Sequence, residues 1–97
     1  MWIISKRTLK DFWETHPETE GPLKSWYEMV DDAAWETPSD VAMTFSKART
    51  IGDSRIVFEI MGGNFRLIAY VYYPHHQVYV KWIGTHAEYD RIDAETV

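Results

Sequence analysis

The chain has 97 residues and a formal net charge of −5, with 45% of its residues apolar and 26% charged. This length suits one domain with a two-layer core, and the acidic charge argues against general affinity for nucleic acids. The absence of cysteine excludes disulfides and thiolate zinc sites, and it favours a reducing, cytoplasmic setting. We therefore expect residues 1–97 to form a single domain, and no apolar run is long enough to span a membrane.

The N-terminal half predicts a short strand followed by two helices. Residues 1–4 are apolar and indicate the strand, and residues 6–15 carry apolar side chains at helical spacing. Pro17 ends this helix, and Pro22, which suits a first helical turn, opens the next one. The inner face of the second helix is expected to comprise Leu23, Trp26, Tyr27, Val30, Ala33 and Ala34.

The C-terminal half predicts three strands joined by two hairpins. The predicted strands span residues 55–61, 64–73 and 77–83. Gly62-Gly63 is a two-residue turn signal between the first two, and Pro74 with the two histidines after it marks the second turn. Outside the strands we expect a short turn through residues 41–43, irregular chain over residues 44–54 and a frayed tail over residues 91–97.

The predicted order is β-α-α-β-β-β, which indicates an α+β fold. The two N-terminal helices would pack on one face of a small, mostly antiparallel sheet. The opposite face of the sheet would then be available for function.

Hairpin geometry assigns each strand residue to one of these two faces. With Gly62-Gly63 as the first loop, Glu59 lies opposite Arg66. With the two histidines as the second loop, Tyr70 lies opposite Lys81, and Arg66 lies opposite Thr85. The face toward the helices should carry Phe58, Ile60, Phe65, Leu67, Ala69, Val71, Val78, Val80 and Trp82. The open face should carry Arg55, Glu59, Arg66, Tyr70, Tyr72, Tyr79, Lys81 and Thr85, with His86 just beyond.

Four residues near the end of the chain combine two cations, an imidazole and a phenol: Arg66, Lys81, His86 and Tyr89. Such a set can bind a phosphodiester and move its protons. Each residue also has a plainer interpretation. Arg66 can pair with Glu59 across the strands, and Lys81 can be a solvated strand residue. His86 can be a turn residue or a helix cap, and Tyr89 a packing aromatic.

With these residues placed, the chain resembles the HigB toxins of bacterial toxin–antitoxin pairs, within the broader RelE-like group. The resemblance is carried by GGNFRLIAYVYY at residues 62–73, YVKWIGTH at residues 79–86 and THAEYD at residues 85–90. The N-terminal half is similar only in its pattern of elements. The resemblance implies a RelE-like fold and a toxin that cleaves mRNA in the ribosomal A site.

The resemblance also implies how such a toxin acts and what it binds. It implies attack of an RNA 2′-OH on the adjacent phosphate without a metal or another cofactor, with catalytic positions at Arg66, Lys81, His86 and Tyr89. Contacts to RNA are expected from Arg55, Asn64, Tyr70 and Tyr79. The implied partners are the ribosome and a cognate helix-turn-helix antitoxin of the HigA type.

A second hypothesis is a non-catalytic interaction module that grips a protein through the aromatic face of the sheet. The acidic net charge favours this hypothesis, whereas the cluster of Arg66, Lys81, His86 and Tyr89 favours the nuclease.

Overall fold

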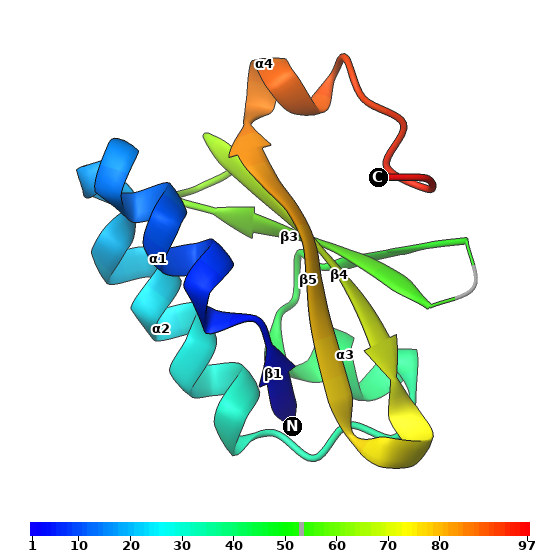
Figure 1. Ribbon diagram of the computed structural model, residues 1–97. Coiled ribbons are helices and arrows are strands. Elements are labelled where there is room, and N and C mark those ends of the chain that lie inside the picture. The colour runs from blue at the N-terminus through cyan, green and yellow to red at the C-terminus, as the bar shows by residue number, and fades with distance from the viewer. Residues whose placement is uncertain (53) are drawn as a thin grey trace.

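The computed structural model describes residues 1–52 and 54–97, and in this part of the chain five strands form one sheet in the order β1-β5-β4-β3-β2 (Figure 1). The strands are β1 (Trp2–Ile4), β2 (Arg49–Ile51), β3 (Arg55–Ile60), β4 (Phe65–Tyr72) and β5 (Gln77–Thr85). β1 runs parallel to β5, and the other neighbours are antiparallel. The sheet is therefore mixed but mostly antiparallel, and the predicted α+β class is confirmed.

The helices follow the predicted order, with additions. They are α1 (Lys6–Thr15), the 3₁₀ turn η1 (Pro17–Thr19), α2 (Glu20–Asp32), α3 (Pro38–Thr44), the 3₁₀ turn η2 (Tyr73–His75) and α4 (His86–Tyr89). α1 has the predicted bounds, and α2 begins two residues before Pro22. Leu23, Trp26 and Val30 are buried on its inner face as expected. Ala34 lies beyond the end of α2 and is exposed, so its predicted inward position was wrong.

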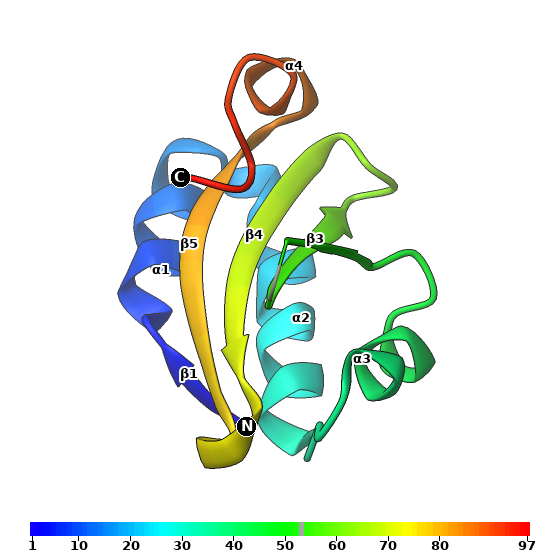
Figure 2. The ribbon, with the colours of Figure 1, turned by 90° about the vertical axis from the view of Figure 1, so that its right-hand side faces the viewer.

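α1 and α2 cover one face of the sheet, as the two ribbon views show (Figure 2). Between these helices and the sheet lies a core of aliphatic and aromatic side chains. It forms because successive side chains of a strand face opposite sides of the sheet, and because each helix presents an apolar stripe. Phe58 on β3 is its aromatic centre, with Trp26 and Phe45 packed edge-on against its ring. The buried core comprises Ile3, Leu9, Leu23, Trp26, Val30, Trp35, Val41, Ile56, Phe58, Ile60, Phe65, Leu67, Ala69, Val71 and Val78.

The described part of residues 41–54 is more regular than the sequence predicted. The expected short turn is part of α3, whose first turn is closed by a reciprocal pair of hydrogen bonds between Thr37 and Asp40. The expectation of irregular chain was wrong for Arg49–Ile51, which form the edge strand β2. Position 53, within the same predicted segment, lies outside the described residues.

The predicted pairing of β3 with β4 is confirmed, since Glu59 lies opposite Arg66. The pairing of β4 with β5 differs at the turn. Tyr70 lies opposite Tyr79 rather than Lys81, because η2 lengthens the turn and the closing pair is Tyr72 with Gln77. This is a shift of two residues, so the faces of these residues are unchanged.

Farther along, the ladder between β4 and β5 contains a bulge at Lys81. Ala69 pairs with Val80 and Ile68 pairs with Trp82, so Lys81 has no partner in β4. Arg66 consequently lies opposite Gly84 instead of Thr85. The extra residue turns Trp82 to the open face, and its predicted place in the core was wrong.

The predicted frayed tail over residues 91–97 was also wrong. The segment after α4 turns back toward the sheet on the side away from α1 and α2 (Figures 1 and 2). The Arg55 guanidinium holds it there by donating to the Ala94 and Val97 carbonyls, at 3.4 and 2.6 Å. The face expected to be open is therefore partly covered.

Leu67 lies at the centre of the sheet, and its side chain is fully buried (0% exposed). Leu67→Ala should lower the free energy of unfolding by about 2–5 kcal/mol, because it removes buried methyl groups and leaves a cavity. Met43→Ala is the control, because Met43 is 84% exposed, and the expected change is within about 0.5 kcal/mol. Urea unfolding monitored by tryptophan fluorescence measures both, and similar losses in the two variants would contradict this core.

Candidate functional site

A row of four side chains crosses the face of the sheet that α1 and α2 leave uncovered. Strand pairing aligns Arg49 with Val57, Val57 with Ile68 and Ile68 with Trp82, and directly paired residues share a face. The two central residues are almost fully buried, with Val57 1% and Ile68 0% exposed. A second, smaller apolar layer therefore exists on this side, between a guanidinium at one end and an indole at the other.

The Tyr89 side chain from α4 contacts both ends of this row. Its hydroxyl oxygen accepts a hydrogen bond from the Arg49 Nη2 at 2.9 Å, and its ring centroid lies 6.3 Å from that of Trp82. The Arg66 guanidinium carbon lies 5.7 Å from the centroid of the same phenol ring. Two guanidinium groups thus flank one phenol, which places the positive charge of both arginines around a partly exposed aromatic ring.

Hydrogen bonds at its N-terminal end fix the position of α4. The Thr85 N–H donates to the Glu88 carboxylate at 2.8 Å, and the Glu88 N–H donates to the Thr85 hydroxyl at 3.1 Å. This capping box stabilises a helix of only four residues. The His86 N–H also donates to the Asn64 carbonyl at 2.9 Å, which ties the helix to the loop between β3 and β4.

Arg66 is oriented by the same loop. Its Nη1 donates to the Gly63 carbonyl, and Gly63 adopts a left-handed φ of 96°. A Cβ at Gly63 would lie 3.0 Å from the Arg66 Nη1 and 3.0 Å from the Glu59 Oε1, so glycine leaves room for both side chains. Of the ion pairs that the described residues form, none joins Arg66 to Glu59, although the two lie opposite each other.

His86 is the first residue of α4 and is exposed. Its Nε2 lies 3.6 Å from an Asp90 carboxylate oxygen, one helical turn away. Its backbone bond to Asn64 places it beside the loop that orients Arg66. The structure thus brings Arg66, His86 and Tyr89 to one end of the sheet, as predicted.

Lys81 is separated from this cluster. Gly84 is the residue opposite Arg66, and Lys81 precedes it by three positions, which is about 10 Å along a strand. Lys81 borders a shallow hollow lined by Tyr70, Tyr72, Gln77 and Tyr79. Tyr70 and Tyr79 lie side by side there, with ring centroids 6.3 Å apart. The described residues therefore form two zones, a cluster under α4 and a tyrosine hollow beside Lys81.

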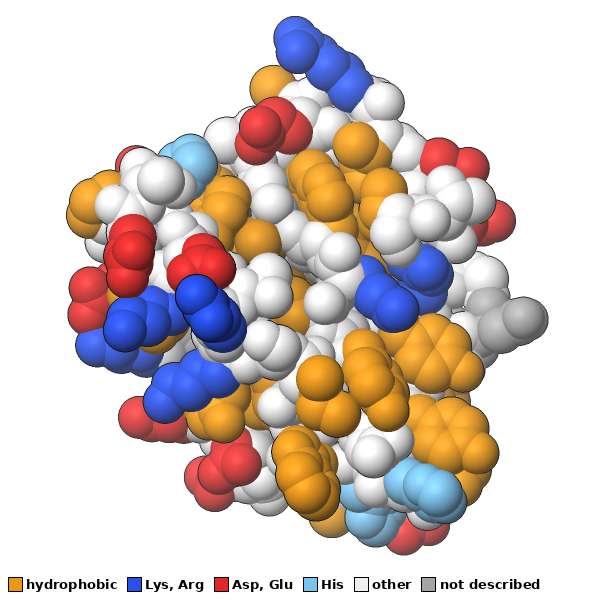
Figure 3. Space-filling view, viewed as in Figure 1, with side chains coloured by type: hydrophobic (Ala, Val, Ile, Leu, Met, Phe, Trp, Pro, Cys, Tyr) orange, Lys and Arg blue, Asp and Glu red, His pale blue; other side chains and the backbone are white. Residues whose placement is uncertain are grey.

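The remaining predicted RNA contacts divide between these zones. Asn64 is exposed in the loop beside α4. Arg55 lies opposite Tyr70, next to the hollow, but its guanidinium is engaged by the C-terminal segment. The space-filling view shows hydrophobic side chains across this face, with Lys and Arg side chains among them right of centre (Figure 3).

Arg49 is the cluster member that sequence reasoning missed. It lies on β2, in a segment expected to be irregular. A signal was present, because the β-branched pair Thr50-Ile51 stands directly ahead of a Gly-Asp pair, a usual sign of a hairpin into the next strand. Its distance of 40 positions from Tyr89 gives no local hint of their contact.

Two findings concern the described residues as a group. No three His, Asp or Glu side chains among residues 1–52 and 54–97 converge as metal ligands would. In that same part of the chain, no helix combines the length and the apolar character needed to cross a membrane.

The chain is also similar in sequence to a known protein family and to characterised proteins. Residues 19–92 match the HigB toxin family, described as the RelE-like toxic component of a toxin–antitoxin system. An mRNA interferase HigB of Escherichia coli O6:H1 is 29% identical over 94 residues, which cover 95% of this chain and 91% of that protein. The mRNA interferase toxin HigB of Escherichia coli K12 is 25% identical over 92 residues, or 93% of this chain and 88% of that protein.

The capping box of α4 should make the site sensitive to acid. The hydrogen bond from the Thr85 N–H is the main cause that lowers the pKa of the Glu88 carboxyl below its ordinary value of 4.5. Because the folded-state pKa is the lower one, the stabilisation by Glu88 is present above pH 4.5 and is lost as pH falls through that lower value.

An NMR titration of the Thr85 amide from about pH 6 to about pH 2 follows the loss of its hydrogen bond to the Glu88 carboxylate. Its midpoint should lie below 4.5, and Glu88→Gln should abolish the transition. A midpoint at or above 4.5 would show that the capping bond does not form in solution.

Proposed function

The chain belongs to the HigB toxins, the RelE-like toxic components of toxin–antitoxin systems, and from this premise we propose that it cleaves mRNA on the ribosome. Relatives similar to it over nearly their whole length are named mRNA interferases. The observation that carries the proposal is the convergence of Arg66, Arg49 and Tyr89, with His86 alongside, at one end of the sheet. These are groups that a phosphodiester-cleaving site requires.

The proposed reaction is attack of an RNA 2′-OH on the adjacent phosphorus. The 2′-OH loses its proton, a bond forms between the 2′ oxygen and phosphorus, and the bond from phosphorus to the 5′ oxygen breaks. The leaving oxygen takes up a proton, so the products are a 2′,3′-cyclic phosphate and a 5′-OH. The chain must therefore supply a proton acceptor, a proton donor and cations for the charge that grows on the phosphate oxygens.

We assign to Arg66 the stabilisation of the negative charge that grows on the phosphate oxygens. Its guanidinium is held at the rim of the cluster by the Gly63 carbonyl. His86 is the proposed proton carrier, because its exposed imidazole lies on the first residue of α4 beside the Asn64 loop and has two ring nitrogens that can donate or accept a hydrogen bond. Tyr89 accepts a hydrogen bond from Arg49, which leaves the phenol O–H free to donate to a phosphate or to the leaving oxygen. Arg49 is then a positioning residue that acts through Tyr89.

We propose for Lys81 a role different from the catalytic one that the resemblance implies. Its position about 10 Å along the strand from the Arg66 row suits a neighbouring phosphate rather than the scissile one. Tyr70 and Tyr79, beside Lys81, present rings on which unpaired bases can stack. Arg55 and Asn64, at the edges of the two zones, complete the proposed RNA path.

The ribosome enters the proposal because the chain is acidic. A protein at −5 gains little from counterion release on RNA, so free RNA should bind poorly. A ribosomal A site would supply the positioning that this small protein does not. The proposed setting is the bacterial cytoplasm, with a helix-turn-helix antitoxin of the HigA type as the cognate partner.

A non-catalytic interaction module remains the second candidate function. Two observations favour it: the acidic net charge, and the aromatic hollow of Tyr70, Tyr72 and Tyr79 on an accessible face. The two candidates differ in a simple way. A binding module would retain its effect on cells when the proton carriers are replaced, whereas a nuclease would not.

Arg66→Ala should slow cleavage of ribosome-bound mRNA about 10²–10³-fold, because it removes a cation that stabilises the transition state. Naked RNA should be cut poorly by the parent protein, and a chelator should have no effect beyond ribosome disassembly. Arg7→Ala, an exposed arginine on α1, is the matched control and should cleave at the parental rate. Primer extension on translated mRNA gives the rates, and parental cleavage by Arg66→Ala would remove Arg66 from the site.

Substitutions at Tyr89 separate proton donation from stacking. If the phenol O–H is the donor, Tyr89→Phe should slow single-turnover cleavage as much as Tyr89→Ala. Arg49→Met should also slow cleavage, by a smaller factor, since it leaves the phenol in place but unsupported. Full activity of Tyr89→Phe together with loss in Tyr89→Ala would assign Tyr89 to base stacking instead.

A further inference from the structure

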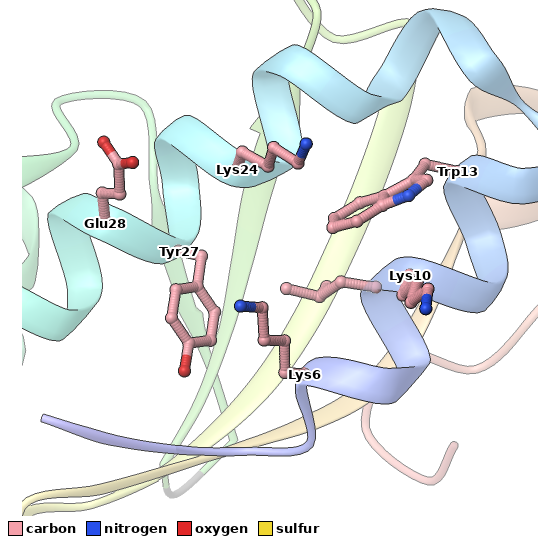
Figure 4. Close-up of a pocket in the computed structure, with 7 residues that line it drawn as sticks. Lys6, Lys10, Trp13, Lys24, Tyr27 and Glu28 are labelled. Atoms are coloured by element: carbon pink, nitrogen blue, oxygen red, sulfur yellow. The ribbon is translucent and has the colours of Figure 1, made fainter.

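A groove on the outer side of the two N-terminal helices belongs to neither zone of the proposed active site. It has a volume of about 460 Å³ and lies between α1 and α2 (Figure 4). The Tyr89 ring lies beside Trp82, on the other side of the sheet from these helices. Its floor is Leu9, which is fully buried, and its walls are the rings of Trp13 and Tyr27. This size is within the range of sites that enclose ligand groups.

The rim of the groove is basic although the whole chain is acidic. Lys6, Lys10 and Lys24 border it, which are three of the chain's five lysines. The Lys6 ammonium lies 5.0 Å from the Tyr27 ring centroid, and the Lys24 ammonium lies 5.4 Å from that of Trp13. Both lysines thus place their charged ends over the aromatic walls (Figure 4).

These charges are incompletely neutralised within the chain. Lys24 pairs with Glu20 on α2, but the described residues offer no ion pair to Lys6 or Lys10. Lys6 and Lys10 are four residues apart on one helix, where like charges repel. The first turn of α1 contains no acidic residue, so Lys6 also opposes the helix dipole. This arrangement is unfavourable in the free protein, and an anionic partner would relieve it.

We propose that this groove is the docking site for an acidic segment of a protein partner, one that places an apolar side chain over Leu9 and carboxylates against the three lysines. The apolar floor and aromatic walls suit a side chain of the leucine or phenylalanine kind. A nucleic acid fits less well, because Glu28 lines the groove and acidic side chains stand among the basic ones over the helices (Figure 3). A peptide can also place an apolar side chain on the Leu9 floor, which a phosphate backbone cannot do.

The probe is a helical peptide with leucines spaced four apart and glutamates between them, and its control is the same peptide with glutamine in place of glutamate. The acidic peptide should bind and shift the Trp13 indole N–H signal in an NMR titration. Its affinity should fall about tenfold or more in Lys6→Glu/Lys10→Glu, because the carboxylates then face like charge. Arg7→Glu is the matched control: Arg7 lies on the same helix outside the groove lining, and the expected change is less than about threefold.

The folded state of the double variant is checked by its unfolding midpoint, which should change little, since both lysines are exposed. Lys6→Glu favours the helix dipole, and the two glutamates repel each other about as the two lysines did. Cleavage of ribosome-bound mRNA by that variant should equal the parental rate, because the groove and the Tyr89 cluster lie on opposite sides of the protein. Absence of peptide binding, equal binding of the glutamine peptide, or equal losses in Arg7→Glu would overturn the proposal. Displacement of the acidic peptide by a uridine 12-mer would assign the groove to RNA instead.

Discussion

The alternation of the central strand β4 is the constraint on which both sides of this protein depend. Leu67, Ala69 and Val71 are drawn into the core by α1 and α2, since burial of apolar side chains is the main favourable term in folding. Their neighbours Arg66 and Tyr70 must then point the opposite way, because successive strand residues face opposite sides. The guanidinium of the proposed active site is therefore positioned by the same packing that stabilises the fold, and a one-residue slip of β4 would disrupt both.

The side opposite the helices is a second, thinner layer rather than a bare sheet. Val57 and Ile68 are buried there, and the chain covers them with its own C-terminal part: the Trp82 and Tyr89 rings, and the segment that Arg55 binds. The four-residue helix α4 packs against this layer, and it needs such packing because so short a helix cannot persist alone. The residues of the proposed active site are consequently held through a short helix and a small set of contacts, among them the Arg49 hydrogen bond to Tyr89 and the His86 hydrogen bond to the Asn64 carbonyl. Low contact density is typical of regions that move when a ligand binds.

The sequence predicted what depends on local pattern and missed what depends on distant contacts. The bounds of α1, the pairing of Glu59 with Arg66 and the apolar face of β4 follow from spacing and turn signals that neighbours in the chain determine. The contact between Arg49 and Tyr89 does not, because it joins an edge strand to a terminal helix. Trp82 was assigned to the wrong face because Lys81, the extra residue of the bulge, is polar and so fits the alternation of polar and apolar residues expected of a regular strand. The bulge therefore cannot be recognised from the pattern. The folded-back tail was missed because its anchor is Arg55, far away in the sequence.

The bulge at Lys81 has a consequence for how this strand tolerates changes in length. Lys81 has no partner in β4, while Val80 and Trp82 on either side of it pair with adjacent residues. A chain lacking this one residue would keep every pairing between β4 and β5 and every side chain on its present face. The ladder would simply become continuous, with less local twist. Deletion of this residue is thus nearly silent for the pairing of β4 with β5, and sequences sharing the architecture are free to lack it, and with it a cation beside the tyrosine hollow.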